Sequence, residues 1–405
     1  MEIIPSTMRS APCLVTLKIT TMSSSLFQIS LVFFITIFSS PFANAAIDLK
    51  YPAVFNFGDS NSDTGNLIAA GIGDPLLSPN GQSFFHQPSG RFCDGRLITD
   101  FLMKGIGHGI PFLNPYLDSI GGPSFKKGCN FATAASTILP TPSSISPFSL
   151  GVQVAQFLEF KARALDILAK SKKMKKYVPP NDFFEKGLYT FDMGQNDLAI
   201  AFYSKTLDQI LASIPAILRG FEDGIQALYE EGARNFWVHN TGPLGCLAQN
   251  VAKFGSDPSK VDGLGCVRAH NEAASLFNLQ LHSLCNKLQA QYSDANIIYV
   301  DIFTIKSNLI ANYSTNGFEQ PLMACCGVGG PPLNYDSRVA CGQTKVLNGT
   351  TVTATGCNNS NAYINWDGIH YTEAANQYVA DQIMTGKYSD PPLADMMTFP
   401  LQLNV

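Results

Sequence analysis

Short apolar runs alternate with stretches of helical periodicity along most of this 405-residue chain. Such an alternation is typical of a parallel sheet whose connections are helices packed on its two faces. The sequence therefore predicts an α/β fold, a doubly wound three-layer αβα sandwich, in a single domain over 46–405. The runs that we expect to form buried strands are Ala53 to Phe57, Leu188 to Asp192, Asn235 to Asn240 and Ile297 to Asp301.

The segment between the second and third of these runs carries the signals of a long helix. Thr206 and Gln209 have the spacing of a capping box, and Gly232 is a C-terminal stop. Pro215 lies inside the segment and is predicted to kink or divide the helix. Further expectations are a weaker strand at Cys129 to Thr133, a helix with Phe277, Leu281, Leu284 and Leu288 on one face, and a final helix that begins near Glu373.

Residues 1–45 are predicted to be a signal peptide that is not part of the fold. An apolar run from Leu26 to Phe38 follows basic residues and precedes Ala43-Asn44-Ala45, which has the small-x-small form that signal peptidase cleaves. The run is short for a bilayer span, which needs roughly 20 residues. We expect cleavage before Ala46, with a retained signal anchor as the less favoured alternative.

The cysteines and sequons fit a secreted protein. Of the 10 cysteines, Cys13 lies in the leader, so an odd number remains and we expect four disulfides with Cys285 as the free thiol. Cys285 shares an apolar helical stripe and should be buried. The expected pairings are Cys246 with Cys266, and Cys325 and Cys326 with Cys341 and Cys357 in either order. Glycosylation is expected at Asn312, Asn348 and Asn358.

The composition excludes several classes of partner. Only 14% of the residues are charged and the net charge is −4, so the chain has no general attraction for nucleic acid or for an anionic membrane. No run after the leader is long enough for stable membrane insertion. The partner that we expect is a small-molecule or polysaccharide substrate, and the oligomeric state stays open.

Polar motifs follow the predicted strands, where ligands bind in sheets of this kind. The first strand runs into Gly58-Asp59-Ser60, and the second into Gly194-Gln195-Asn196-Asp197. A further motif, Asp367-Gly368-Ile369-His370, precedes the final helix. Each motif alone is more often a turn or a helix cap than a catalytic element. The combination of all three at separate junctions is what indicates chemistry.

These motifs contain the parts of a nucleophilic site. A serine hydroxyl is a weak nucleophile until a base takes its proton, and His370 could serve Ser60 in this way. Asp367 is close enough in sequence to orient the imidazole. An ester carbonyl also needs an oxyanion hole, for which the candidates are the Ser60 NH, an NH in the turn Ala132 to Ser136, and the Asn196 amide.

The chain resembles the plant GDSL esterase/lipases of the SGNH hydrolase superfamily. Four blocks carry the resemblance: Phe57 to Asn66, Gly128 to Ala132, Gly194 to Asp197 and Trp366 to His370. It extends through Gly90 to Arg96, Thr241 to Cys246 and Ala324 to Gly327, so it covers nearly all of the mature chain. The resemblance implies a flavodoxin-like parallel sheet and a secreted serine hydrolase acting on carboxylic esters, with no cofactor and no metal. Position by position, it implies Ser60 as nucleophile, Asp367 and His370 as the rest of the triad, and Ser60, Ala135 and Asn196 as oxyanion donors.

Two positions depart from the family pattern. Asn61 replaces the leucine of the motif, and Ala135 stands where the family usually has a glycine whose NH serves the oxyanion hole. The change at position 61 should be mild, because the side chain after the nucleophile need not enter the chemistry. Alanine also supplies an NH, provided that its backbone avoids positive φ, where glycine is favoured.

The expected function is a secreted serine esterase that forms an acyl-enzyme on Ser60. The expected substrates are short-chain or acetyl esters of a plant metabolite or wall polymer, outside the cell, in the wall, or in the vacuole. One alternative is a catalytically silent relative that binds glycan or protein. Another is a metal-dependent hydrolase using Asp59, Asp63, Asp197 and His370. His239, the basic patch Lys170 to Lys176, and the group Arg91, Asp94 and Arg96 are interpreted as structural or solvated.

Overall fold

The computed structural model describes residues 51–106, 112–120 and 122–393, and the predicted signal peptide lies outside them. A six-stranded sheet has the order β10-β5-β4-β3-β1-β2, in which only β10 is antiparallel to its neighbour. From β2 to β5 this is the flavodoxin-like order, so the predicted fold class is confirmed. The strands are β1 (Val54–Gly58), β2 (Gly128–Asn130), β3 (Leu188–Asp192), β4 (Asn235–His239), β5 (Asn296–Val300) and β10 (Ser389–Asp390).

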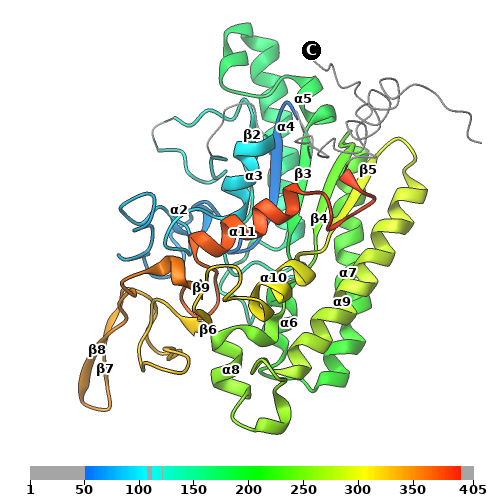
Figure 1. Ribbon diagram of the computed structural model, residues 1–405. Coiled ribbons are helices and arrows are strands. Elements are labelled where there is room, and N and C mark those ends of the chain that lie inside the picture. Colours follow the sequence, from blue (N-terminus) through cyan, green and yellow to red (C-terminus); the bar gives the residue numbers. More distant parts are fainter. Residues whose placement is uncertain (1–50, 107–111, 121, 394–405) are drawn as a thin grey trace, which may run out of the picture. The chain divides into compact units, whose positions relative to one another are not determined.

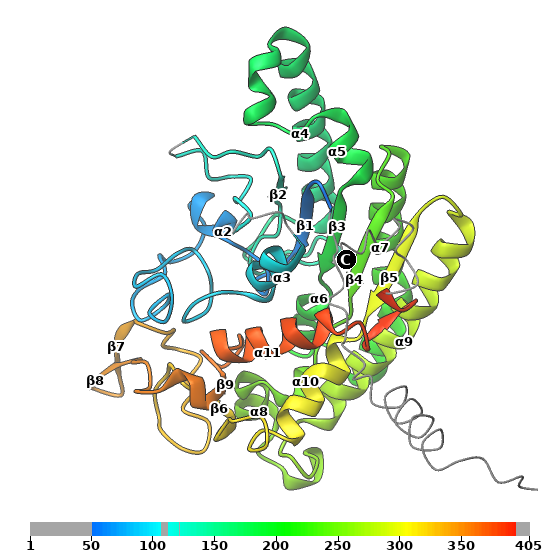
Figure 2. The same cartoon turned by 45° about the horizontal axis from the view of Figure 1, so that its top comes forward.

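Helices cover both faces of this sheet (Figures 1 and 2). One layer packs α4 against α7 and α7 against α9, while the other packs α11 against α3 and α10. No helix in the described ranges has the length and hydropathy needed to cross a bilayer. The long helices are α3 (Ile98–Ile106), α4 (Leu150–Lys170), α7 (Leu207–Glu230), α9 (Arg268–Gln291), α10 (Ile302–Ala311) and α11 (Glu373–Met384); shorter ones are α2 (Asn66–Ala69), α5 (Asn181–Lys186), α6 (Gln195–Ala201) and α8 (Ala248–Phe254).

Helix α7 begins and ends as its sequence predicts. The Thr206 hydroxyl accepts a hydrogen bond from the Gln209 NH, and the Gln209 side chain accepts one from the Thr206 NH, which completes the capping box. Gly232 follows the last turn with φ of 94°. Pro215 does not divide the helix, contrary to one of the two expectations. It removes only one backbone hydrogen bond, and the buried apolar stripe from Ile210 to Leu228 continues on both sides of it.

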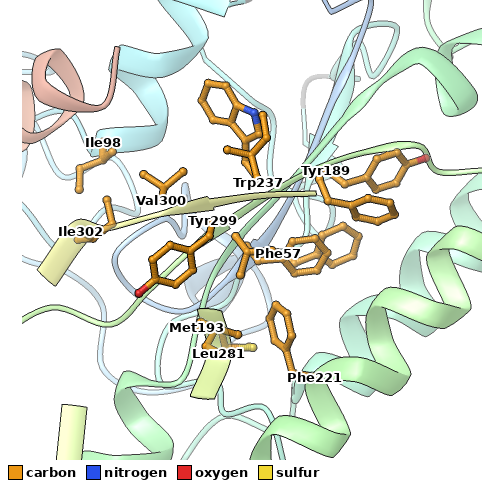
Figure 3. Close-up of a cluster of buried hydrophobic side chains, with 14 of the residues drawn as sticks. Phe57, Ile98, Tyr189, Met193, Phe221, Trp237, Leu281, Tyr299, Val300 and Ile302 are labelled. Atoms are coloured by element: carbon orange, nitrogen blue, oxygen red, sulfur yellow. The ribbon is translucent and has the colours of Figure 1, made fainter. Parts of the chain in front are cut away.

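The core is aromatic on the face of the sheet that α4 and α7 cover. Phe57 of β1 stacks on Phe191 of β3 with ring centroids 5.1 Å apart, and Phe191 meets Phe221 of α7 edge to face. Figure 3 shows Phe221 and Trp237 on opposite sides of the strands. Full burial of each such ring contributes about 1.5–3 kcal/mol. The opposite face also carries buried polar side chains, among them Asn56, Thr190 and His239.

Three disulfides join cysteines of the described residues: Cys246–Cys266, Cys325–Cys357 and Cys326–Cys341. The structure thus decides how Cys325 and Cys326 pair with Cys341 and Cys357, which the sequence left open. The expectation of four disulfides is wrong for this part of the chain, because Cys93 and Cys129 are free and buried, as is Cys285. The Cys93 sulfur accepts hydrogen bonds from the Gly95 NH and the Asn376 amide, so its surroundings already satisfy it.

Candidate active site

Ser60, His370 and Asp367 form a continuous chain of hydrogen bonds. The Oγ of Ser60 lies 2.8 Å from Nε2 of His370, although the two residues are 310 positions apart. The other ring nitrogen of His370, Nδ1, lies 2.7 Å from Oδ2 of Asp367. Ser60 and His370 are each 7% exposed, so the hydroxyl and the imidazole meet in a largely dry environment.

The loop after β9 (Tyr363–Asn365) fixes the carboxylate of Asp367. Its Oδ1 accepts hydrogen bonds from the NH groups of Ile369 and His370, at 3.0 and 2.8 Å. Burial acts to raise the pKa of Asp367, but the neighbouring His370 and these donors outweigh it and the pKa is lowered. Asp367 therefore stays ionised and can hold the Nδ1 proton of the imidazole.

A tight turn at the end of β1 presents Ser60. Gly58 must be a glycine, because a Cβ there would lie 2.4 Å from the Ser62 hydroxyl and 2.7 Å from the Asp192 carbonyl oxygen. The Asp59 carbonyl accepts from the NH groups of Ser62 and Asp63, and the Asp59 NH donates to the Asp192 carbonyl. The nucleophile turn is therefore joined directly to the end of the neighbouring strand β3.

The three residues expected to supply an oxyanion hole differ in their hydrogen bonds. The backbone NH groups of Ser60 and Ala135 have no acceptor within the described residues. The Asn196 amide nitrogen donates to the Ser136 carbonyl at 2.9 Å and lies 3.4 Å from Oδ2 of Asp59. Asn196 is thus held beside the turn that contains Ala135, and the NH groups of Ser60 and Ala135 are not used by other hydrogen bonds of the described residues.

Ala135 has a positive φ, although the sequence analysis expected alanine to serve here only if its backbone avoided positive φ. Its φ is +60°, in the left-handed region that costs a non-glycine residue about 1–2 kcal/mol. The surrounding turn imposes this conformation. Asp63 accepts from the Ala134 NH at 2.8 Å, and Asp197 accepts from the NH groups of Ile138 and Leu139 at 2.9 and 3.2 Å. The backbone thus keeps the conformation of a glycine position while carrying a methyl group.

Replacing Ala135 with glycine is expected to stabilise the protein slightly and to leave catalysis nearly intact. Relief of the positive φ outweighs the added freedom of glycine in the unfolded chain, so the free energy of unfolding should rise by less than about 1 kcal/mol. The NH is already presented, so kcat should change less than about tenfold. Urea unfolding and steady-state kinetics on one short-chain ester measure both. A gain near a hundredfold in kcat would mean that the alanine site lacks this donor.

The carboxylates considered for a metal are used as hydrogen-bond acceptors. Asp63 accepts from four backbone NH groups, those of Gly65, Asn66, Leu67 and Ala134. Burial raises the pKa of Asp197 to about 7, which reflects its position inside the protein, where it holds a turn. No group of three or more His, Cys, Asp or Glu side chains within the described ranges is arranged to hold a metal ion. The metal-dependent alternative therefore has no candidate donor set there.

The remaining residues from the sequence analysis have structural surroundings. Arg91 forms a buried ion pair with Asp100 at 2.7 Å, and Arg96 pairs with Glu373 at 2.6 Å. Burial lowers the pKa of His239 to about 4, so this side chain is neutral. The basic patch ends in a short 3-10 helix, Lys172–Lys176, with no buried residue.

Two residues near the site were not among those predicted from the sequence. The ring of Phe92 lies 5.3 Å from the His370 ring. A Cβ on Gly368 would lie 2.1 Å from the ring of Tyr335. This position, in the loop between Asp367 and His370, therefore requires glycine. The block from Gly90 to Arg96 could have drawn attention to Phe92, whereas nothing local to Tyr335 indicates its place.

Comparison with known proteins gives a consistent result. Residues 54–383 match the family described as GDSL-like Lipase/Acylhydrolase. The chain is 61% identical to GDSL esterase/lipase At1g54790 of Arabidopsis thaliana, over 92% of this chain and 98% of that protein. It is 58% identical to GDSL esterase/lipase At3g05180 of the same plant, over 87% and 93%, and 42% identical to a protein named Esterase from Hevea brasiliensis, over 90% and 93%.

A parallel α/β sheet with a hydrogen-bonded serine, histidine and aspartate beyond its strands is typical of serine hydrolases. The chain belongs to the GDSL esterase/lipase family, and it is a carboxylic ester hydrolase.

Proposed function

We propose that this protein is a serine esterase that works through an acyl-enzyme on Ser60. The observation that supports it most is the hydrogen-bond chain from Ser60 through His370 to Asp367. An intact chain of this kind gives no support to a silent, glycan- or protein-binding relative. Labelling of the folded protein with a fluorophosphonate, which reacts with activated serines, tests the proposal. Absence of labelling and of ester turnover would favour the silent alternative.

The reaction follows from the positions of these groups. His370 Nε2 takes the Ser60 proton as Oγ attacks the ester carbonyl carbon. Negative charge then grows on the carbonyl oxygen, where the NH groups of Ser60 and Ala135 and the amide of Asn196 can stabilise it. His370 returns the proton to the departing alcohol, which leaves the acyl group on Oγ. Water attacks next, gives its proton to His370, and the carboxylic acid is released as Ser60 regains its hydrogen.

A small cavity beside the triad supports substrates with short acyl groups. Its free volume is about 10 Å³, and its lining includes Asn61, Gln195 and Ile369, which are neighbours in sequence of Ser60, Asn196 and His370. Apolar walls come from Leu244 and Leu247. A recess this small has no room to enclose a long acyl chain, which favours acetyl or other short-chain esters of a plant metabolite or wall polymer.

Activity on p-nitrophenyl esters is expected to fall as the acyl chain lengthens beyond about four carbons, because a longer chain would have to leave this cavity. Steady-state kcat/KM across a series from acetate to palmitate measures the effect. Native acetylated substrates would follow, to separate metabolite from polysaccharide esters. A maximum at the longest chains would contradict the short-chain assignment and indicate a lipase.

We further propose that the protein is secreted, with residues 1–45 as a signal peptide and 46–405 as one domain. Support comes from the three disulfides, which form in oxidising compartments. The three sequons are exposed: Asn312 follows α10, Asn348 lies in the turn between β7 (Thr344–Leu347) and β8 (Thr350–Thr353), and Asn358 precedes β9. N-terminal sequencing of the mature plant-expressed protein, with and without glycosidase treatment, tests cleavage and glycosylation together.

A further inference from the structure

Gly368 lies between Asp367 and His370, and both of its backbone polar groups are held. Its NH donates to Oδ1 of Asn365 at 2.7 Å, and its carbonyl oxygen accepts from the Gln249 NH at 3.0 Å. Gln249 lies in the first turn of α8, where a backbone NH has no acceptor within its own helix. The bend between the acid and the base of the candidate triad is therefore fixed by contacts from outside it.

The ring of Tyr335 packs directly on this bend. It is so close to Gly368 that a Cβ there would lie 2.1 Å from Cδ2 and 2.5 Å from Cε2 of the tyrosine. Gly368 has a φ of 99°, which residues with a side chain rarely adopt, so the packing of this bend has to come from a neighbour. The Tyr335 hydroxyl donates to Oε1 of Gln249 at 3.1 Å. The residue whose NH binds Gly368 thus also holds the tyrosine.

The segment that carries Tyr335 is itself cross-linked to the catalytic loop. The disulfide Cys326–Cys341 closes this segment, which contains Tyr335. The Cys326 NH donates to the carbonyl of Trp366, the residue before Asp367, at 2.6 Å. Burial raises the pKa of Tyr335 and the charge of Asp367 raises it further, so the hydroxyl keeps its proton and remains a donor. The tyrosine is therefore held in place from its backbone and from its hydroxyl.

We propose that Tyr335 is a positioning residue for ester hydrolysis, whose ring holds the bend at Gly368. The bend sets the geometry between Asp367 and His370, the pair that activates the nucleophile. This inference rests on the function proposed above and deepens it. Without the ring, Gly368 gains access to further backbone conformations, because glycine is the least restricted residue. Asp367 accepts from the His370 NH across this bend at 2.8 Å, so a rotated bend moves the acid relative to the base.

Tyr335→Ala removes the ring, whereas Tyr335→Phe keeps the ring and removes the hydroxyl. For Tyr335→Ala we expect kcat on p-nitrophenyl acetate to fall about 10- to 100-fold, because a misplacement of about 1 Å in an active site can cost about 100-fold. KM should stay within about threefold, because the bend does not bind the substrate. Tyr335→Phe should keep kcat within about threefold of the wild type. Tyr177→Ala, at a tyrosine that is 40% exposed, is the matched control and should retain wild-type kinetics.

A second background separates positioning from general packing. In His370→Ala the base is absent, so a correctly held bend has nothing to act on. We expect Tyr335→Ala to lower the kcat of His370→Ala by less than about threefold, since the members of a triad act as a unit. A tyrosine that supported the enzyme in another way would cause the same 10- to 100-fold loss in both backgrounds. Thermal unfolding of each variant establishes that the proteins compared are folded.

Four results would overturn the proposal: a wild-type kcat in Tyr335→Ala, an equal loss in the His370→Ala background, a loss in Tyr335→Phe as large as in Tyr335→Ala, or a loss seen only in KM, which would make Tyr335 a substrate contact. If Tyr335→Ala does not fold, Tyr335→Leu, which lacks the ring but keeps an apolar side chain, is judged by the same criteria. Failure of both to fold would also overturn the proposal, since Tyr335 would then serve stability. Fluorophosphonate labelling of the wild type separates these outcomes from failure of the serine mechanism itself.

Discussion

Ser60→Ala is expected to reduce kcat by about a millionfold while the protein remains folded. Members of a triad act as a unit, and removal of the nucleophile alone in serine hydrolases costs about as much as removal of all three residues. Loss of one hydroxyl at a site joined by backbone hydrogen bonds should leave the turn at Asp59 intact. Steady-state turnover of p-nitrophenyl acetate and fluorophosphonate labelling measure the two consequences.

Thermal unfolding of the Ser60→Ala protein is the control for this experiment. Its midpoint should lie within a few degrees of the wild type, because the side chain removed is small and, among residues 51–106, 112–120 and 122–393, its hydrogen-bond partner is His370. A Ser60→Ala protein that retains most of its esterase activity would end the proposal that Ser60 carries the acyl group.

Asp367→Asn is expected to lower kcat by about ten thousandfold with little change in KM. An amide at this position can donate to Nδ1 of His370, which leaves the proton on Nε2 and removes the base that Ser60 needs. Because the acyl and alcohol groups of the substrate do not touch Asp367 in this mechanism, ground-state binding should persist. Separate determination of kcat and KM on the same ester tests this.

Addition of EDTA to the wild-type enzyme provides a contrasting measurement. The serine mechanism predicts full activity in the chelator, and loss of activity would count against the triad and in favour of a metal-dependent reaction. Full activity of the Asp367→Asn protein would exclude Asp367 as the group that orients His370.

The sheet was predictable because buried parallel strands have nearly continuous apolar sequences. The run Leu188 to Asp192 forms β3 over those same residues, and the other three main strands begin and end within one residue of their predictions. Strand β10 could not be found this way, since Ser389–Asp390 contains no apolar residue and pairs only because the chain returns to the edge at β5. Its position depends on contacts far apart in sequence.

The site was predictable where chemistry requires particular side chains in order along the chain. Ser60, Asn196, Asp367 and His370 follow strands, and the fold brings them to one edge of the sheet. The φ of Ala135 could not be predicted, because the turn that contains it is held by acceptors distant in sequence, such as Asp63 at the Ala134 NH. The burial of Lys306 was equally hidden. A lone lysine in an apolar helix normally faces solvent.

The order of the triad along the chain affects when the enzyme becomes active. Ser60 leaves the ribosome early, and its base follows 310 residues later. At a typical rate of synthesis, roughly 15 to 60 seconds separate them. During that interval the serine has no proton acceptor, so a nascent chain cannot hydrolyse esters in the compartment where it is made. Proteolysis between α10 and His370 would also inactivate the enzyme unless the C-terminal segment stayed attached. The disulfides Cys325–Cys357 and Cys326–Cys341 would keep that segment attached after many such cleavages.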